Sequence, residues 1–195
     1  MGYHIQVILT DWEKVARLYG SKDHSLLNIV KEELYEEFDD FLYGVFDMDT
    51  GELSAKQLML NCINGDTTNE YKHLICGPDK EKFAQESLGA VYRYLHIEIC
   101  LHFGYEINRN KDGWPMLPAY MHTFEERYRS FFKIPYSAEF PQLFCVLDDE
   151  LDTYYPMWQE RLKEAYPTEN YLQKDLDFIF EEARKTGLSI LLANH

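Results

Sequence analysis

The chain has 195 residues, of which 46% are hydrophobic and 27% are charged, and its formal net charge is −15. This length and apolar content are typical of a single globular domain over residues 1–195, or at most of a domain with a small subdomain, and they exclude a disordered chain. The acidic balance argues against nucleic-acid binding, which depends on clustered Lys and Arg side chains, and favours a basic protein partner or simple solubility.

Two further features predict a cytoplasmic protein. No apolar run approaches the roughly 20 residues of a membrane span, and the opening run Val7-Ile8-Leu9 is too short for a signal peptide. Four cysteines lie far apart without a C-x-x-C pair, which indicates reduced, buried thiols. They are Cys62, Cys76, Cys100 and Cys145. Reduced thiols are the usual state in the cytoplasm.

The N-terminal segment predicts a strand followed by a helix. Residues 3–9 form a β-branched and aromatic run that is typical of a strand. The sequence Thr10-Asp11-Trp12-Glu13 has the pattern of a capping box, so we expect Thr10 to cap a helix that reaches about Tyr19 and ends at Gly20.

The segment from about His24 to Tyr43 predicts one long amphipathic helix. Its apolar residues recur at spacings of three and four and therefore share one face, which holds Leu27, Val30, Leu34, Phe38, Phe41 and Val45. Asp39 and five other acids fall on the opposite face, where like charges one turn apart cost roughly 0.2–0.5 kcal/mol per pair. A Lys/Arg-rich partner would relieve this repulsion. We therefore predict partner binding at Glu32, Glu33, Glu36, Glu37 and Asp40.

The middle of the chain predicts three helices and a loop. Ser54 is a cap for a helix over 55–63 that ends at Asn64-Gly65, and a short helix is expected over 69–76. The segment 82–103 is apolar on two faces, which places it in the middle of the domain. Residues 113–141 hold four of the seven prolines and many aromatics, as in an ordered loop packed on the core.

The C-terminal part predicts a strand over 143–147 and a helix over 148–165 that is bent or broken near Pro156. Thr168 should cap the last helix, which ends at Gly187 before a strand over 188–193. We expect the first and last strands to pair. The predicted fold is therefore α+β and predominantly helical, with a small sheet that includes both terminal strands and is covered by amphipathic helices.

An alternative function is a small-molecule-binding enzyme with a pocket in the loop 113–141. Trp114, Tyr120, His122 and Arg127 lie close together in this loop, and Glu126 follows His122 by one helical turn. A carboxylate beside an imidazole can orient it for acid/base work, although the same Glu is explained by a helix cap. No established catalytic motif occurs, so the sequence assigns no catalytic residue and leaves open whether the chain is an enzyme.

A metal site is the third hypothesis, and the residue pattern disfavours it. His73 precedes Cys76 by three residues and His96 precedes Cys100 by four, so each pair would present two zinc ligands on one helix face. The stronger interpretation of the second pair is a buried thiol beside a hydrogen-bonded imidazole. We therefore expect no metal and no cofactor.

The order and spacing of several segments resemble those of a family of uncharacterised bacterial proteins with a domain of unknown function. The resemblance covers most of the chain and is carried by the opening strand, Gly20-Ser21-Lys22-Asp23, His102-Phe103-Gly104, Trp114, Phe140-Pro141 and Thr186-Gly187-Leu188. It implies no activity and no residue roles. From the charge pattern we expect an interaction module that binds a basic partner through the acidic helix, as immunity or adaptor proteins do.

Overall fold

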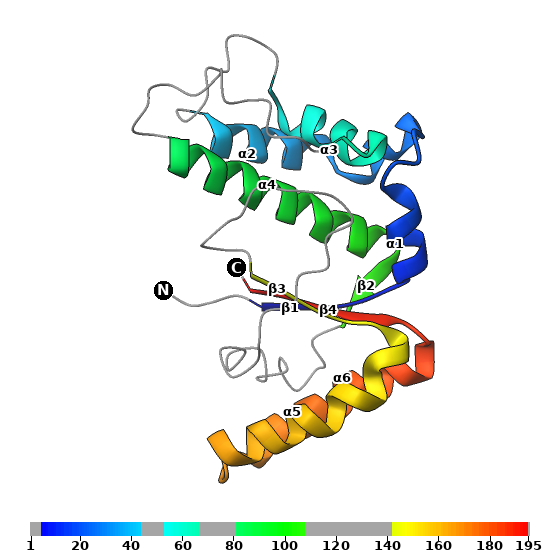
Figure 1. Cartoon of the computed structure of the whole chain (residues 1–195), viewed down its shortest axis with the longest axis vertical. Helices are drawn as coiled ribbons and strands as arrows, with labels where there is room; N and C mark the ends of the chain where they lie inside the picture. The colour runs from blue at the N-terminus through cyan, green and yellow to red at the C-terminus, as the bar shows by residue number, and fades with distance from the viewer. Residues whose placement is uncertain (1–4, 44–52, 67–80, 108–141, 195) are drawn as a thin grey trace. The chain divides into compact units, whose positions relative to one another are not determined.

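The computed structural model describes residues 5–43, 53–66, 81–107 and 142–194, and these fall into two compact units. The sheet unit comprises the described residues among 1–12, 103–107 and 142–194. The helical unit comprises the described residues among 13–102. Figure 1 labels the helices and strands of both units. The single domain expected for the whole chain stays a prediction.

The sheet unit is a four-stranded antiparallel sheet with two long helices. Its elements are β1 (Ile5–Thr10), β2 (Gly104–Glu106), β3 (Gln142–Val146), the 3₁₀ turn η6 (Asp148–Glu150), α5 (Leu151–Ala165), α6 (Asn170–Thr186) and β4 (Ser189–Asn194). The strand order is β2-β1-β4-β3, and Val7 of β1 lies opposite Leu192 of β4. The predicted pairing of the first and last strands is therefore confirmed, as is the α+β class.

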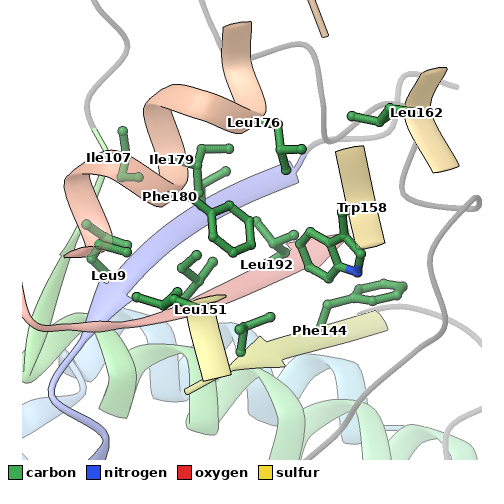
Figure 2. Close-up of a cluster of buried hydrophobic side chains, with 14 of the residues drawn as sticks. Leu9, Ile107, Phe144, Leu151, Trp158, Leu162, Leu176, Ile179, Phe180 and Leu192 are labelled. Carbon is green, nitrogen blue, oxygen red and sulfur yellow. The ribbon is translucent and has the colours of Figure 1, made fainter. Parts of the chain in front are cut away.

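An apolar cluster joins one face of this sheet to α5 and α6. Leu9 and Leu192 point from the strands toward Trp158 of α5 and Phe180 of α6 (Figure 2). The Trp158 and Phe180 rings meet edge to face, with centroids 5.6 Å apart. Residues of the opposite face, such as Ile8, are buried as well. Both faces of each central strand are therefore apolar, which explains the continuous hydrophobic runs at the two ends of the chain.

Gly104 permits the close approach of β2 to β1. A Cβ atom at this position would lie 1.9 Å from the carbonyl oxygen of Leu9, so every other residue would force the strands apart. Gly187 ends α6 as predicted, with φ of 66° and its N–H donated to the carbonyl of Ala183.

Two sequence predictions in the sheet unit are wrong. The break expected near Pro156 does not occur, because Pro156 and Asp152 are both exposed to water, and the Asp152 carbonyl, which lacks its usual partner, is therefore not buried. The alternative expectation, a bend at Pro156, stays a prediction. Thr168 does not cap α6, since Glu169 holds the N-cap position and makes no side-chain capping bond.

The helical unit contains four α-helices and one 3₁₀ helix in its described part. They are α1 (Trp12–Leu18), η1 (His24–Ile29), α2 (Glu32–Leu42), α3 (Ala55–Asn64) and α4 (Glu81–His102). α2 and α3 run beside α4 in Figure 1 and contact it. α4 is buried on several sides, for example at Leu95 and Ile97, as its two apolar faces predicted. The expected helix over 69–76 lies outside the described residues.

The ends of α3 form as predicted and anchor the loop after α1. The Ser54 hydroxyl accepts a hydrogen bond from the Gln57 N–H at 3.1 Å, and Gly65 ends the helix with φ of 73°. Gly20 donates its N–H to the Cys62 carbonyl, and a Cβ on Gly65 would lie 3.2 Å from the Gly20 Cα. Two glycines in the left-handed region therefore allow the loop to pack closely on the C-terminal end of α3 and to donate a hydrogen bond to one of its last carbonyls.

The single helix expected over 24–43 is wrong, and the cap expected at Thr10 stays a prediction. Asp23 caps η1 by accepting the Ser25 N–H, and Val30 is then extended before α2 begins after Lys31. Local side-chain capping and the β-branched Val30 thus interrupt a periodicity that continues in the sequence. Thr10 is the last residue of β1, and α1 begins two residues later.

None of the described helices combines the length and the apolar character needed to cross a membrane.

Candidate functional site

Helix α2 attaches to the rest of the helical unit through one side. Tyr35 and Leu42 are buried, and the Tyr35 hydroxyl donates a hydrogen bond to the Leu27 carbonyl at 2.9 Å. The ring of Phe38 stacks on Tyr94 of α4, with centroids 5.6 Å apart. These contacts determine which side of α2 faces outward.

The outward side carries four carboxylates, which we call the acidic face: Glu33, Glu36, Glu37 and Asp40. At 3.6 residues per turn they fall within an arc of roughly 100°, opposite the buried side chains. All four are exposed. In the described part of the chain none of them forms an ion pair or a hydrogen bond through its side chain. Their charge is therefore not neutralised within the helical unit.

The other two acids of α2 have partners inside the unit. Glu32 forms an ion pair with Lys56 of α3 at 3.0 Å. Asp39 accepts a hydrogen bond from the Ala55 N–H, at the start of α3. Glu32, which the sequence grouped with the partner-binding acids, thus differs from the four residues of the acidic face. Asp39 serves as a structural link between α2 and α3.

Phe41 lies on the exposed side of α2, and its predicted place on the apolar face is wrong. The side chain is 51% exposed. The helix packs along Tyr35, Phe38 and Leu42 instead of Leu34, Phe38 and Phe41, which turns Phe41 toward Glu37 on the outside. Tyr43 at the end of the helix is 71% exposed. Both patterns have helical spacing, so the contact with α4 decides between them.

A second polar feature of the helical unit lies in its interior. His96 of α4 is buried, with its Nδ1 2.5 Å from the Tyr19 hydroxyl and its Nε2 3.6 Å from the Cys100 sulfur. The Tyr19 and His96 rings stack at 5.9 Å. Burial lowers the pKa of His96 to about 4, so the imidazole is neutral at pH 7. This is the buried thiol and hydrogen-bonded imidazole that the sequence predicted for the pair.

His96 and Cys100 have the atoms of a base and a thiol but no access to a substrate. Cys100 and His96 are 0% and 1% exposed, which hides the thiol from any reactant in solution. His73 and Cys76, the other two residues of the metal hypothesis, lie outside the described residues. Within the described ranges, no three His, Cys, Asp or Glu side chains are grouped as a metal site would require.

Trp114, Tyr120, His122 and Arg127, with the whole loop 113–141, lie outside the described residues. The small-molecule enzyme that depends on them therefore stays a prediction from the sequence.

Comparison with known proteins assigns a family but no activity. A family model described as a domain of unknown function, DUF7691, matches residues 1–188. Searches of the curated proteins and of the solved structures found no significant match. The family is uncharacterised, as the sequence resemblance implied, and the acidic face of α2 is the feature from which a function can be argued.

Proposed function

This chain belongs to the DUF7691 family, and we propose that it is a protein-interaction module that binds a basic protein partner through the acidic face of α2. An immunity or adaptor protein acts in this way. Charge attraction would guide the encounter, and the helix would supply a rigid surface. A bacterial origin and a cytoplasmic location are part of the proposal, and the buried Cys62, Cys100 and Cys145, which form no disulfide, support a reducing compartment.

The observation that carries the proposal is the contrast between paired and unpaired acids on one helix. Glu32 and Asp39 are held by Lys56 and by the Ala55 N–H. The acidic face instead places Glu33 one turn from Glu37, and Glu36 one turn from Asp40. Each like-charge pair of this kind destabilises a helix by roughly 0.2–0.5 kcal/mol. Lys and Arg side chains of a partner would convert this repulsion into attraction.

The proposal also defines the partner. A surface of four exposed carboxylates attracts cations and repels phosphates, so nucleic acid is not the expected ligand. Exposed charges are screened by salt over about 8–10 Å. Binding through the acidic face should therefore be fast at low ionic strength and should weaken as salt is added.

The test is a comparison of two double variants with equal charge change. Glu36→Lys/Asp40→Lys reverses an exposed pair one turn apart on α2. The matched control, Glu160→Lys/Glu164→Lys, reverses an exposed pair one turn apart on α5. Wild type and both variants are immobilised, incubated with source-cell lysate at low salt, eluted with salt and analysed by mass spectrometry.

We expect a stoichiometric basic protein that wild type and the α5 variant retain and that the α2 variant loses. Circular dichroism establishes that all three chains are folded. A protein that both variants lose to the same extent would reflect net charge and not a site. If the α2 variant retains every protein that wild type retains, the acidic face serves solubility and the proposal is wrong.

A further inference from the structure

The acidic face of α2 ends beside an exposed aromatic ring. Glu33, Glu37 and Phe41 follow one another at intervals of four residues, so they form a single row along the helix. Glu36 and Asp40 form the neighbouring row. Phe38, which lies only three residues before Phe41, is held in the unit by Tyr94. Phe38 is therefore packed within the helical unit, whereas the side chain of Phe41 is half exposed to water.

The exposure of Phe41 differs from that of other surface aromatics. Four large apolar side chains are exposed in the described part of the chain: Phe41, Tyr43, Tyr105 and Tyr171. Only Phe41 lacks a hydroxyl group that could contact water. Tyr171, by contrast, donates its hydroxyl to Glu169. Two of the four, Phe41 and Tyr43, lie at the end of α2, beside the acidic face. Single exposed apolar residues are common, but aromatic anchors next to steering charges are typical of interfaces.

We propose that Phe41 is the apolar anchor of the partner-binding surface and that the occupant is an amphipathic basic helix of a protein partner, an inference that rests on the partner binding proposed above. Lys or Arg side chains at spacings of three and four on that helix would contact the two acidic rows. An apolar residue one turn beyond them would cover Phe41. A helix is the expected shape because the rows of α2 are ridges that pack into the grooves of another helix.

The two parts of this surface have different effects on binding. The carboxylates raise the association rate and make it dependent on salt. Phe41 loses water only in the complex, so it slows dissociation and discriminates between partners that carry an apolar residue and those that do not. A partner with positive charge alone would bind weakly and without this discrimination.

The experiment uses two synthetic amphipathic helical peptides of equal length and equal Lys content. One carries Leu at its apolar positions and the other carries Ala. Their affinities for the full chain are measured by surface plasmon resonance for wild type, Phe41→Ala and the control Tyr171→Ala, an exposed aromatic on α6. We expect wild type to bind the Leu peptide about tenfold more tightly than the Ala peptide. Phe41→Ala should abolish this ratio, and Tyr171→Ala should preserve it.

The outcomes separate this inference from the proposed function. If both peptides bind wild type equally and Glu36→Lys/Asp40→Lys abolishes both, the acidic face binds cations but Phe41 is not an anchor. If a Leu preference exists and survives Phe41→Ala, the anchor lies elsewhere. If neither peptide binds wild type at low salt, the helical occupant and hence this inference are wrong, whereas the proposed function is decided by the lysate comparison above. A thermal melt of Phe41→Ala that matches wild type establishes that the substitution left the fold intact.

Discussion

Polar side chains have different surroundings and partners in the sheet unit and in the helical unit. In the sheet unit the cluster between the sheet and α5 and α6 is wholly apolar (Figure 2). The polar groups between the two helices contact one another. Asp177 accepts hydrogen bonds from the Tyr155 hydroxyl at 2.7 Å and from the Gln173 amide at 2.9 Å. The bond to Asp177 raises the pKa of Tyr155 to about 12.

The helical unit holds a buried imidazole and a group of four exposed carboxylates on one helix face. His96 is buried in its interior, and the four carboxylates of the acidic face are exposed without a partner among the described residues. α6 is also an acidic helix, yet Asp177 and Glu182 have partners within the fold. The number of acids on a helix therefore does not identify a binding surface. Unpaired acids also occur on α5, at Glu160 and Glu164, so the proposal depends on the gathering of four such acids on one face of α2 beside Phe41.

The largest expected effect concerns the buried His96. Its pKa is about 4 in the folded chain and 6.5 in a solvated imidazole. The unfolded state therefore binds the proton first, so stability is lost as pH falls below about 6.5 and continues to fall until about 4. At pH 5 the loss is about 2 kcal/mol relative to neutral pH. Hydrogen exchange should detect this loss as weaker protection of the α4 amides at pH 5 than at neutral pH. The protection of the β4 amides should change less.

His96→Gln is the control for this prediction. Glutamine keeps hydrogen-bonding atoms near Tyr19 and Cys100 but does not titrate, so the stability of α4 should be nearly constant between about pH 7 and pH 5. Carboxylates titrate mostly below this range. An equally steep loss in wild type and variant would show that His96 is not the group responsible.

The next effect tests the paired acids of the sheet unit. Asp177→Ala removes the acceptor of two hydrogen bonds and leaves Tyr155 and Gln173 with donors that have lost their partner. We expect a loss of about 1–2 kcal/mol in the free energy of unfolding, measured by urea denaturation. Asp177→Asn keeps an acceptor oxygen and should lose less. A fully stable Asp177→Ala would mean that these bonds contribute nothing and that the contrast between the units is not energetic.

Much of the fold could be predicted because its signals are local. Ser54 and Gly65 mark the ends of α3, and Gly187 marks the end of α6. The apolar runs at the two ends of the chain predicted strands that pair. The break at Val30 could not be predicted, since Leu27, Val30 and Leu34 keep helical spacing across it. The capping of η1 by Asp23 favours a separate short helix before Val30, and the spacing of apolar residues does not reveal such a side-chain contact.

The candidate site was predictable in part for a related reason. The position of Glu33, Glu36, Glu37 and Asp40 on the polar side of a helix follows from their spacing alone. The exposure of Phe41 does not, because two sets of apolar residues fit the same period and only the stacking of Phe38 on Tyr94 selects one. The ion pair between Glu32 and Lys56 could not be predicted from the sequence either, since 24 residues separate them.

The smallest expected effect is the most direct test of the contrast between the two acidic helices. Glu36→Gln/Asp40→Asn removes two charges from the acidic face and keeps the side-chain shapes. Because the repulsion disappears, and because Asp40 lies near the unfavourable negative end of the α2 dipole, we expect a gain in stability of a few tenths of a kcal/mol, on the order of 0.5. Thermal melts at low and high salt measure it, and the gain should shrink as salt screens the charges. A loss like that of Asp177→Ala would show that these carboxylates stabilise the fold and are not held free for a partner.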